Sequence, residues 1–201
     1  MGHARPKNWP DGLPYLHSPL FSKCLSTSQI EVLRTKPASL LLIPASETVT
    51  PSPRVRIQQI RDAQHPANGQ LGLFAAQNLK PGTFILAYLG RVHAGASSSS
   101  LADSDYDLWL DKEADLAVDA AVEGNEGRFV NDYRGIKEKP NVEFAPIWCE
   151  RWGQVCVGIW VTRGKSSKGI RRGDEILVNY GKGFWQERRK CEPEPPVALY
   201  D

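Results

Sequence analysis

The sequence predicts a mostly β (α+β) fold of many short strands joined by turns, with one short helical arm near the N-terminus. Its 201 residues include 17 glycines and 15 prolines, which interrupt the chain too often for a helical bundle. Short stretches alternate apolar and polar residues, as half-buried strands do. We expect strands near residues 55–60, 72–76, 84–89, 105–110, 144–150, 155–162 and 175–180, and a further buried strand in the apolar run 40–43.

One short segment carries helix signals. Ser28 and Glu31 have the spacing of a capping box, in which the serine covers free amides of the first turn and the glutamate reaches back. Pro37 then ends the stretch, because proline cannot continue a helix. We therefore expect a helix over about residues 29–36, inside an N-terminal extension of residues 1–52.

Composition argues against two classes of partner. Lysine plus arginine number 25 and aspartate plus glutamate 23, so the net charge of +2 argues against direct nucleic-acid binding. No apolar stretch approaches the ~20 residues of a membrane span. The N-terminus also lacks the apolar core of a secretory signal. We expect an intracellular protein with no membrane partner; its oligomeric state is not indicated.

Cysteines and histidines predict neither a metal site nor a disulfide framework. The cysteines have no CxxC spacing, and the histidines have no ligand spacing and are expected on the surface or in loops. These residues are Cys24, Cys149, Cys156 and Cys191, and His3, His17, His65 and His93.

A hairpin is expected where residues 144–150 and 155–162 flank a turn. If Trp152 and Gly153 form a two-residue turn, Cys149 faces Cys156 across the strands. We expect two buried thiols there in preference to a disulfide or a metal pair.

Three segments gather residues that are typical of binding sites. The first, residues 68–75, holds Gly69 and Gly72, which permit a tight turn and close approach of a ligand. The others are VDAAVEGNEGRFVND at 118–132 and IRRGDEILVNYG at 170–181. Each is ordinary alone: glycine-rich turns are common, and Tyr180 by itself reads as a core aromatic on a strand.

The chain also contains GLFA at 72–75, LKPGTFILAYLGRV at 79–92, DYDLWLD at 105–111 and PNVEF at 140–144. Taken together with the segments above, their order along the chain resembles that of SET-domain protein-lysine methyltransferases. The resemblance covers roughly residues 53–185. Within the family, the sequence is distantly similar to the branch of histone H3 lysine-27 monomethyltransferases. It implies a β-clip of small sheets with a threaded C-terminal segment, in a SET domain at 53–190 followed by a tail at 191–201.

The resemblance implies transfer of a methyl group from S-adenosylmethionine to a lysine side chain. A free lysine has a pKa of ~10.4 and must lose its proton before it attacks. A narrow apolar channel favours the neutral amine. In-line displacement then requires the amine and the methyl group on one axis, with no metal ion.

Carried over by position, the resemblance gives Tyr180 the catalytic role and places Tyr106 near the lysine channel, with Tyr88 in the core. The residues expected to bind the cofactor are Gln70, Leu71, Gly72, Arg128, Phe129, Asn131 and Asp132. A cysteine-rich C-terminal module of the family is missing, so Phe184 or Trp185 is expected to cover the adenine; packing of a C-terminal helix explains this pair equally well.

The sequence departs from the family pattern around Asp132. This residue stands where the family has a histidine, the nearby cysteine is absent, and residues 134–139 lengthen the following loop. The effect of Asp132 on cofactor binding is open. Val178, two residues before Tyr180, leaves the number of methyl groups undetermined.

Charge favours a basic peptide as substrate. Between Asp103 and Glu126, a region that borders the peptide groove in the family, stand nine acidic residues and one basic residue, which would attract a basic peptide. Together with these charges, the resemblance implies a histone H3 tail as the leading substrate and a nuclear protein. A solvated strand face explains the same charges. A non-histone substrate is one alternative, and a catalytically idle scaffold that binds peptide or protein is another, against which the retained Tyr180 argues.

Overall fold

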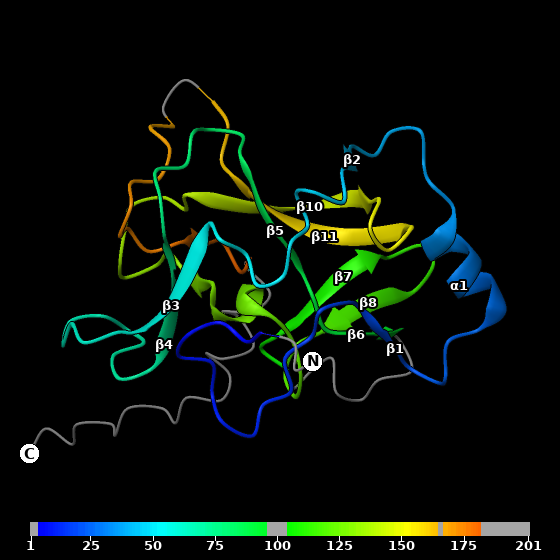
Figure 1. Ribbon diagram of the computed structural model, residues 1–201, viewed down its shortest axis with the longest axis horizontal. Coiled ribbons are helices and arrows are strands. Elements are labelled where there is room, and N and C mark those ends of the chain that lie inside the picture. The colour runs from blue at the N-terminus through cyan, green and yellow to red at the C-terminus, as the bar shows by residue number, and fades with distance from the viewer. Residues whose placement is uncertain (1–3, 96–103, 165–166, 182–201) are drawn as a thin grey trace, which may run out of the picture.

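A computed structural model of the chain describes residues 4–95, 104–164 and 167–181, and its strands form four small sheets (Figure 1). The strand order is β1-β6-β8-β7 in one sheet and β2-β10-β11-β5 in a second, and the pairs β3-β4 and β9-β12 form the other two. The bounds are β1 Leu20–Phe21, α1 Thr27–Arg34, β2 Leu42–Ile43, β3 Val55–Gln59, β4 Leu71–Ala75, β5 Phe84–Tyr88, β6 Arg91–Ala94, β7 Asp107–Asp111, β8 Leu116–Asp119, η1 Glu126–Phe129, β9 Asn131–Asp132, β10 Val142–Cys149, β11 Gln154–Val161 and β12 Leu177–Val178. The mostly β prediction is confirmed, although β1, β6, β8 and β9 were not among the expected strands.

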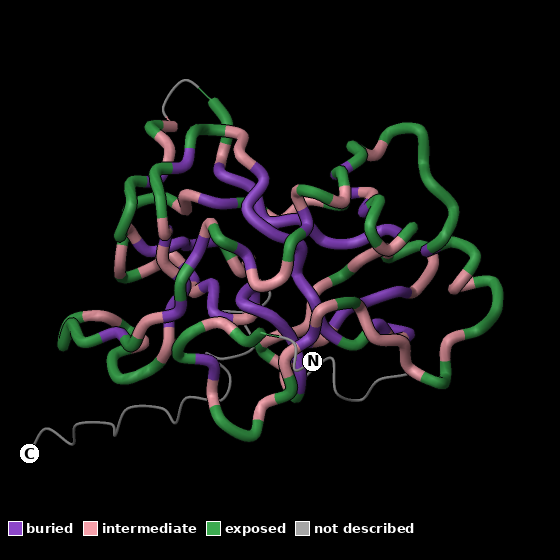
Figure 2. Tube along the Cα trace, in the orientation of Figure 1, coloured by how far each residue is buried: buried purple, intermediate pink, exposed green. Residues whose placement is uncertain are grey.

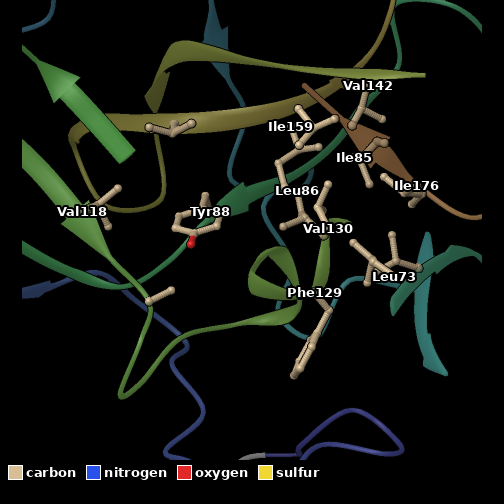
Figure 3. Packing of buried hydrophobic residues seen from close by; sticks show 14 of the residues in the cluster. Leu73, Ile85, Leu86, Tyr88, Val118, Phe129, Val130, Val142, Ile159 and Ile176 are labelled. Atoms are coloured by element: carbon tan, nitrogen blue, oxygen red, sulfur yellow. The ribbon is translucent and has the colours of Figure 1, made fainter. Parts of the chain in front are cut away.

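The core forms where β11 and the edge strand β5 of the second sheet meet η1. Every residue of β5 and β11 is buried, and both strands run purple through the middle of Figure 2. Figure 3 shows Leu86, Val130 and Ile159 pointing toward one another from β5, the end of η1 and β11. A strand buried on both faces needs an almost continuous apolar run, which β11 has.

The β10-β11 hairpin has a different register from the expected one. Cys149 pairs with Gln154 and Cys156 with Ile147, so residues 150–153 form the turn. The amide of Gly153 bonds to the carbonyl of Glu150 and Gly153 adopts φ 57°, which closes a four-residue turn instead of a two-residue one. The thiols become diagonal neighbours. A hydrogen bond with Cys149 and burial raise the pKa of the Cys156 thiol, and both cysteines are free and buried as predicted.

The N-terminal helix begins at a different cap. Ser26, not Ser28, accepts the amide of Gln29, and the Gln29 side chain returns to the amide of Ser26. The Gln29 side chain also donates to the carbonyls of Ala114 and Asp115, at 3.2 and 3.1 Å. Because this tertiary contact is available to Gln29, α1 spans Thr27–Arg34, two residues earlier than expected.

The N-terminal extension is joined to the rest of the fold. β1 pairs with β6, and β2 pairs with β10, both in parallel. Trp9 is buried, with its ring edge-on to Tyr15 and Phe129. The apolar run at 40–43 contributes only Leu42–Ile43 as strand, and Leu42 is exposed, so the expectation of a fully buried strand was wrong. A boundary at residue 52 stays a prediction.

The C-terminal segment passes between two distant parts of the chain. Glu175 bridges to Phe74 of β4 on one side, and β12 pairs in parallel with β9 on the other. The side chain of Asn141 holds the segment at two points: it donates to the carbonyl of Glu175 at 2.7 Å and accepts the amide of Leu177 at 2.8 Å. This threading brings residues 131–132 beside residues 177–180.

Candidate active site

Two adjoining cavities lie where η1, β9 and the C-terminal segment meet. The larger has a volume of about 360 Å³ and is lined by Pro10, His65, Pro66, Ala67, Gln70, Leu71, Asp105, Tyr106, Arg128, Phe129, Asn131, Asp132, Arg134, Ile136 and Tyr180. The smaller, of about 90 Å³, is lined by Tyr88, Ser104, Asp105, Tyr106, Asp107, Leu108, Gly127, Arg128, Val130, Phe144, Asn179 and Tyr180. Asp105, Tyr106, Arg128 and Tyr180 line both, so these four side chains separate the two spaces.

The structure brings most of the expected site residues together. Gln70, Leu71, Arg128, Phe129, Asn131 and Asp132 line the larger cavity, and Tyr106 and Tyr180 line both. Gly72 lines neither and is buried beneath them. A Cβ on Gly72 would lie 2.8 Å from Oε1 of Glu175, so a side chain at this position would force the Glu175 carboxylate to shift. Phe184 and Trp185 lie outside the described residues.

Tyr180 is held at both ends by the segment that follows η1. Its hydroxyl donates to the carbonyl of Val130 at 2.7 Å, and its amide donates to Oδ2 of Asp132 at 2.8 Å. Because the hydroxyl hydrogen is committed to Val130, the phenolic oxygen can act toward a ligand only as an acceptor. An acceptor is what a neutral amine or a polarised methyl group requires.

Two further tyrosines shape the smaller cavity. The guanidinium carbon of Arg128 lies 4.4 Å from the centroid of the Tyr106 ring. The guanidinium group also donates hydrogen bonds to the carbonyls of Ala120 and Ala121. Tyr88 belongs to the core, as expected, and also lines the smaller cavity; its hydroxyl donates to the carbonyl of Tyr106 at 2.7 Å. Burial raises the pKa of Tyr88, so this hydroxyl stays a donor at neutral pH.

A buried network holds Asn131, and sequence reasoning missed two of its members. The Asn131 side-chain nitrogen donates to Oε1 of Glu175 at 2.9 Å, and Oε2 of Glu175 lies 2.9 Å from Nε2 of His65. Since Nδ1 of His65 accepts the amide of Ala67, Nε2 carries the hydrogen. The side chains of His65 and Glu175 are only 7% and 9% exposed. The sequence pattern that could have identified Glu175 is the motif GDEILVNYG, in which it stands. No sequence pattern pointed to His65.

Among the described histidines, the expectation of a surface or loop position was wrong for His93, which stands on β6 with Nε2 3.2 Å from Asp107. His65 lies in the loop after β3, as expected, but its side chain is buried against Glu175. His3 lies outside the described residues. The side chains of His65 and His93 each pair with a carboxylate from another part of the chain. Among the described residues, no group of three or more His, Cys, Asp or Glu side chains is arranged to hold a metal ion.

Three segments supply apolar wall to the larger cavity. Pro10 comes from the N-terminal extension, Pro66 from the loop between β3 and β4, and Ile136 from the turn after β9. This turn is closed by hydrogen bonds from the amides of Ile136 and Lys137 to the carbonyl of Tyr133, at 3.1 and 2.9 Å. The lengthened loop at 134–139 therefore contributes to the cavity wall.

Several acidic residues of the 103–126 stretch serve the fold. Glu126 is buried and accepts from Tyr15 and from the amide of Ser52, at 2.8 and 2.7 Å. Glu123 is buried and paired with Arg91. Burial raises the pKa of Asp107 to about 6, although the neighbouring His93 acts to lower it. Asp105 and Glu113 are exposed, so the negative surface is smaller than the sequence count indicates.

The larger cavity fits an amphipathic ligand of nucleoside size. Its volume lies in the range of small-molecule sites. Pro10, Pro66 and Ile136 offer apolar contact for a flat ring, while Gln70 and Asn131 offer polar groups. S-adenosylmethionine combines an adenine ring with a charged amino-acid end, and this mixture of walls suits both.

The comparisons with known proteins agree with this fold. A family model for the SET domain matches residues 70–181. Among solved structures, an active polycomb repressive complex 2 in the basal state is similar with a TM-score of 0.51 and 23% identity, over 66% of this chain and 16% of that chain. The Chaetomium thermophilum complex bound to GSK126 is similar with a TM-score of 0.51 and 22% identity, over 70% and 17%.

A third structure has a ligand of interest. The complex called ctPRC2, in an autoinhibited conformation bound to S-adenosylmethionine, is similar with a TM-score of 0.50 and 22% identity, over 70% of this chain and 16% of that chain. The present chain thus spans a small part of these relatives, and the likeness is one of fold. S-adenosylmethionine is the cofactor of SET-domain methyltransferases. The family model covers more than half of the sequence, and the chain belongs to the SET-domain family.

Proposed function

We propose that the protein is an S-adenosylmethionine-dependent protein-lysine N-methyltransferase, with the cofactor in the larger cavity and the target lysine in the smaller. The observation that carries this proposal is the shared wall. Tyr106 and Tyr180 line both cavities, so a ligand in each would meet its neighbour beside Tyr180. A scaffold that only bound peptide would need no second cavity on the far side of that tyrosine.

The residues of the smaller cavity suit a lysine that must lose its proton. Tyr88, Tyr106 and Phe144 exclude water from it, and this loss of hydration disfavours a charged ammonium group, against the attraction of Asp105 and Asp107 in the same wall. A volume of about 90 Å³ equals roughly three waters at about 30 Å³ each, enough for one extended side chain. The released proton goes to solvent, and the nitrogen lone pair is then free to attack.

Tyr180 and its neighbours would then align the reaction. When bound, S-adenosylmethionine supplies a methyl group on a sulfonium, whose C–S bond breaks as the new C–N bond forms. The Tyr180 oxygen would accept a hydrogen bond from the amine, and the hydrogen bond from its hydroxyl to the carbonyl of Val130 holds the oxygen in one place. Holding the nucleophile on the reaction axis is a large part of what such a site contributes.

We propose a lysine in a basic protein segment as the substrate, with the histone H3 tail as the leading candidate and a nuclear location to match. Asp105 is exposed and lines both cavities, which favours a peptide with positive charge near its lysine. A non-histone protein with the same charge pattern is the alternative. No helix among the described residues is long and apolar enough to cross a membrane.

The test is a radiolabelled methyl-transfer assay on the full chain. Core histones, an H3 tail peptide and a cell extract are offered in parallel, and cofactor binding is measured by calorimetry. We expect label on H3 that disappears in Tyr180→Phe, while this variant still binds S-adenosylmethionine. Label on an extract protein alone would identify a non-histone substrate. No transfer and no cofactor binding would leave the idle scaffold.

A further inference from the structure

The carboxylate of Asp132 is buried and uses both of its oxygens. Its side chain is 6% exposed. Oδ2 accepts the amide of Tyr180 at 2.8 Å, and Oδ1 accepts the amide of Arg134 at 2.9 Å. Nη1 of Arg134 lies 2.8 Å from Oδ2 and 3.1 Å from Oδ1. The charge of Asp132 is therefore neutralised by the same arginine that follows it in the chain.

Arg134 continues the network past Tyr180. Its Nη2 donates to Oδ1 of Asn179 at 3.1 Å, and the same oxygen accepts the amide of Gly181 at 2.9 Å. Asn179 is thus tied to the segment after β9, and Gly181 is tied to Asn179. Charge-assisted hydrogen bonds of this kind are shorter and stronger than neutral ones.

The hydrogen bonding of the backbone explains why a side chain, and not a main-chain carbonyl, accepts the amide of Tyr180. β9 and β12 form a parallel ladder that ends with the amide of Tyr133 bonded to the carbonyl of Val178 at 2.9 Å. In a continued parallel ladder, the amide of Tyr180 would bond to the carbonyl of Tyr133. That carbonyl instead accepts the amides of Ile136 and Lys137, which close the turn in the lengthened loop. The turn removes the ladder acceptor, and Asp132 provides another.

We propose that Asp132, supported by Arg134, is a positioning residue for methyl transfer: it holds the backbone of Tyr180 so that the phenolic oxygen stays between the two cavities. This inference rests on the proposed function. The two departures from the family pattern, an aspartate at 132 and a longer loop at 134–139, are then one coupled feature. The loop takes away a backbone acceptor and the aspartate replaces it.

The substitution Asp132→Asn tests this role, because an amide offers one acceptor oxygen where the carboxylate offers two. We expect kcat to fall by about 100-fold, the scale of a misplaced reacting group, while the Kd for S-adenosylmethionine changes by less than about threefold. Asp174→Asn is the matched control: it breaks an exposed ion pair with Arg171 shortly before β12, and neither residue lines the site cavities. We expect it to leave kcat unchanged.

A double substitution separates positioning from a general structural effect. If Asp132 acts through the Tyr180 hydroxyl, adding Asp132→Asn to Tyr180→Phe lowers kcat by less than about threefold further. The full loss in both backgrounds would overturn the inference, and so would an effect confined to the Kd of S-adenosylmethionine. Should Asp132→Asn fail to fold, Arg134→Gln addresses the same network and is expected to lower kcat in the same direction.

Amide hydrogen exchange reads the hydrogen bond without catalysis. The Tyr180 amide is expected to be protected in the parent chain and in Asp174→Asn, and to lose at least about tenfold of that protection in Asp132→Asn. Unchanged protection would overturn the inference even in an active enzyme. A parent chain that transfers no methyl group would instead refute the proposed function, while the exchange data would still report whether Asp132 holds Tyr180.

Discussion

The hydroxyl of Tyr180 donates to the carbonyl of Val130 at 2.7 Å, although the two residues are 50 positions apart in the sequence. Val130 follows η1 and Tyr180 follows β12, so this bond joins two segments that line the site. It fixes the rotation of the phenol and leaves its oxygen as an acceptor. The carbonyl thereby sets the chemical role of the tyrosine.

The first prediction concerns that hydroxyl. Tyr180→Phe removes the acceptor and leaves the ring, so we expect kcat to fall by at least about 100-fold with little change in cofactor Kd. Radiolabel transfer and calorimetry on the same preparations measure the two effects. Tyr133→Phe is the control, because it removes a nearby tyrosine hydroxyl that lines neither cavity. Equal losses in the two variants would contradict the assignment.

A second prediction concerns the buried carboxylate on the cofactor side. In the parent chain, Asn131 and His65 each bond to a different carboxylate oxygen of Glu175. Glu175→Gln leaves a single acceptor oxygen for the two of them. We expect the Kd for S-adenosylmethionine to rise about tenfold, which equals about 1.4 kcal/mol, with a smaller effect on kcat. Calorimetry measures it, with Asp174→Asn as the neighbouring control. A fall in kcat at constant Kd would show that Asn131 is not held for the cofactor.

The third prediction is a pH dependence of stability. Burial raises the pKa of Asp107 to about 6 from 3.8, so the folded state binds a proton that the unfolded state has lost between these values. The contribution of Asp107 to the free energy of unfolding therefore falls as pH rises from about 4 to about 6.

Asp107→Asn abolishes this titration. We expect the unfolding free energy of the variant, minus that of the parent, to increase by roughly 1–3 kcal/mol over the same pH window. Urea unfolding at pH 4, 5, 6 and 7 measures this difference. A difference that stays constant with pH would mean that Asp107 titrates normally in the folded chain.

The fourth prediction tests whether the N-terminal extension is part of the fold. Trp9 is 8% exposed and its ring nitrogen donates to the carbonyl of Leu13 at 2.7 Å. We expect Trp9→Ala to cost about 3–5 kcal/mol and to weaken cofactor binding, because Phe129 beside it lines the larger cavity. Trp109→Ala, at a tryptophan that is 43% exposed, is expected to cost far less. Similar unfolding midpoints would mean that the extension packs only loosely.

The order of the motifs, more than any single motif, identified much of the site before the structure. Gln70, Arg128, Asn131 and Tyr180, assigned by their positions in the resemblance to the SET-domain family, line the larger cavity. Composition and alternation predicted short strands and turns. Each motif alone had an ordinary structural explanation, so the site followed from the family and not from local chemistry.

Local patterns predicted the wrong element boundaries where two interpretations of the sequence were equally good. Ser26 with Gln29 and Ser28 with Glu31 both satisfy a capping box, and the contact of Gln29 with the chain before β8 decides between them. The turn before Gln154 has the same ambiguity, and pairing along β10 and β11 selects the longer loop. The free energy that separates such alternatives comes from distant contacts.

Only the tertiary structure joined residues whose partners are far away in sequence. His65 meets Glu175 across 110 positions, and Tyr180 meets Asp132 across 48. No periodicity or spacing relates such pairs, because threading of the C-terminal segment between β4 and β9 creates the contacts. The sequence by itself identified the family and, through it, several of the residues that line the cavities. The fold decided which buried carboxylates hold them, since a buried charge is stable only where a partner arrives to bond it.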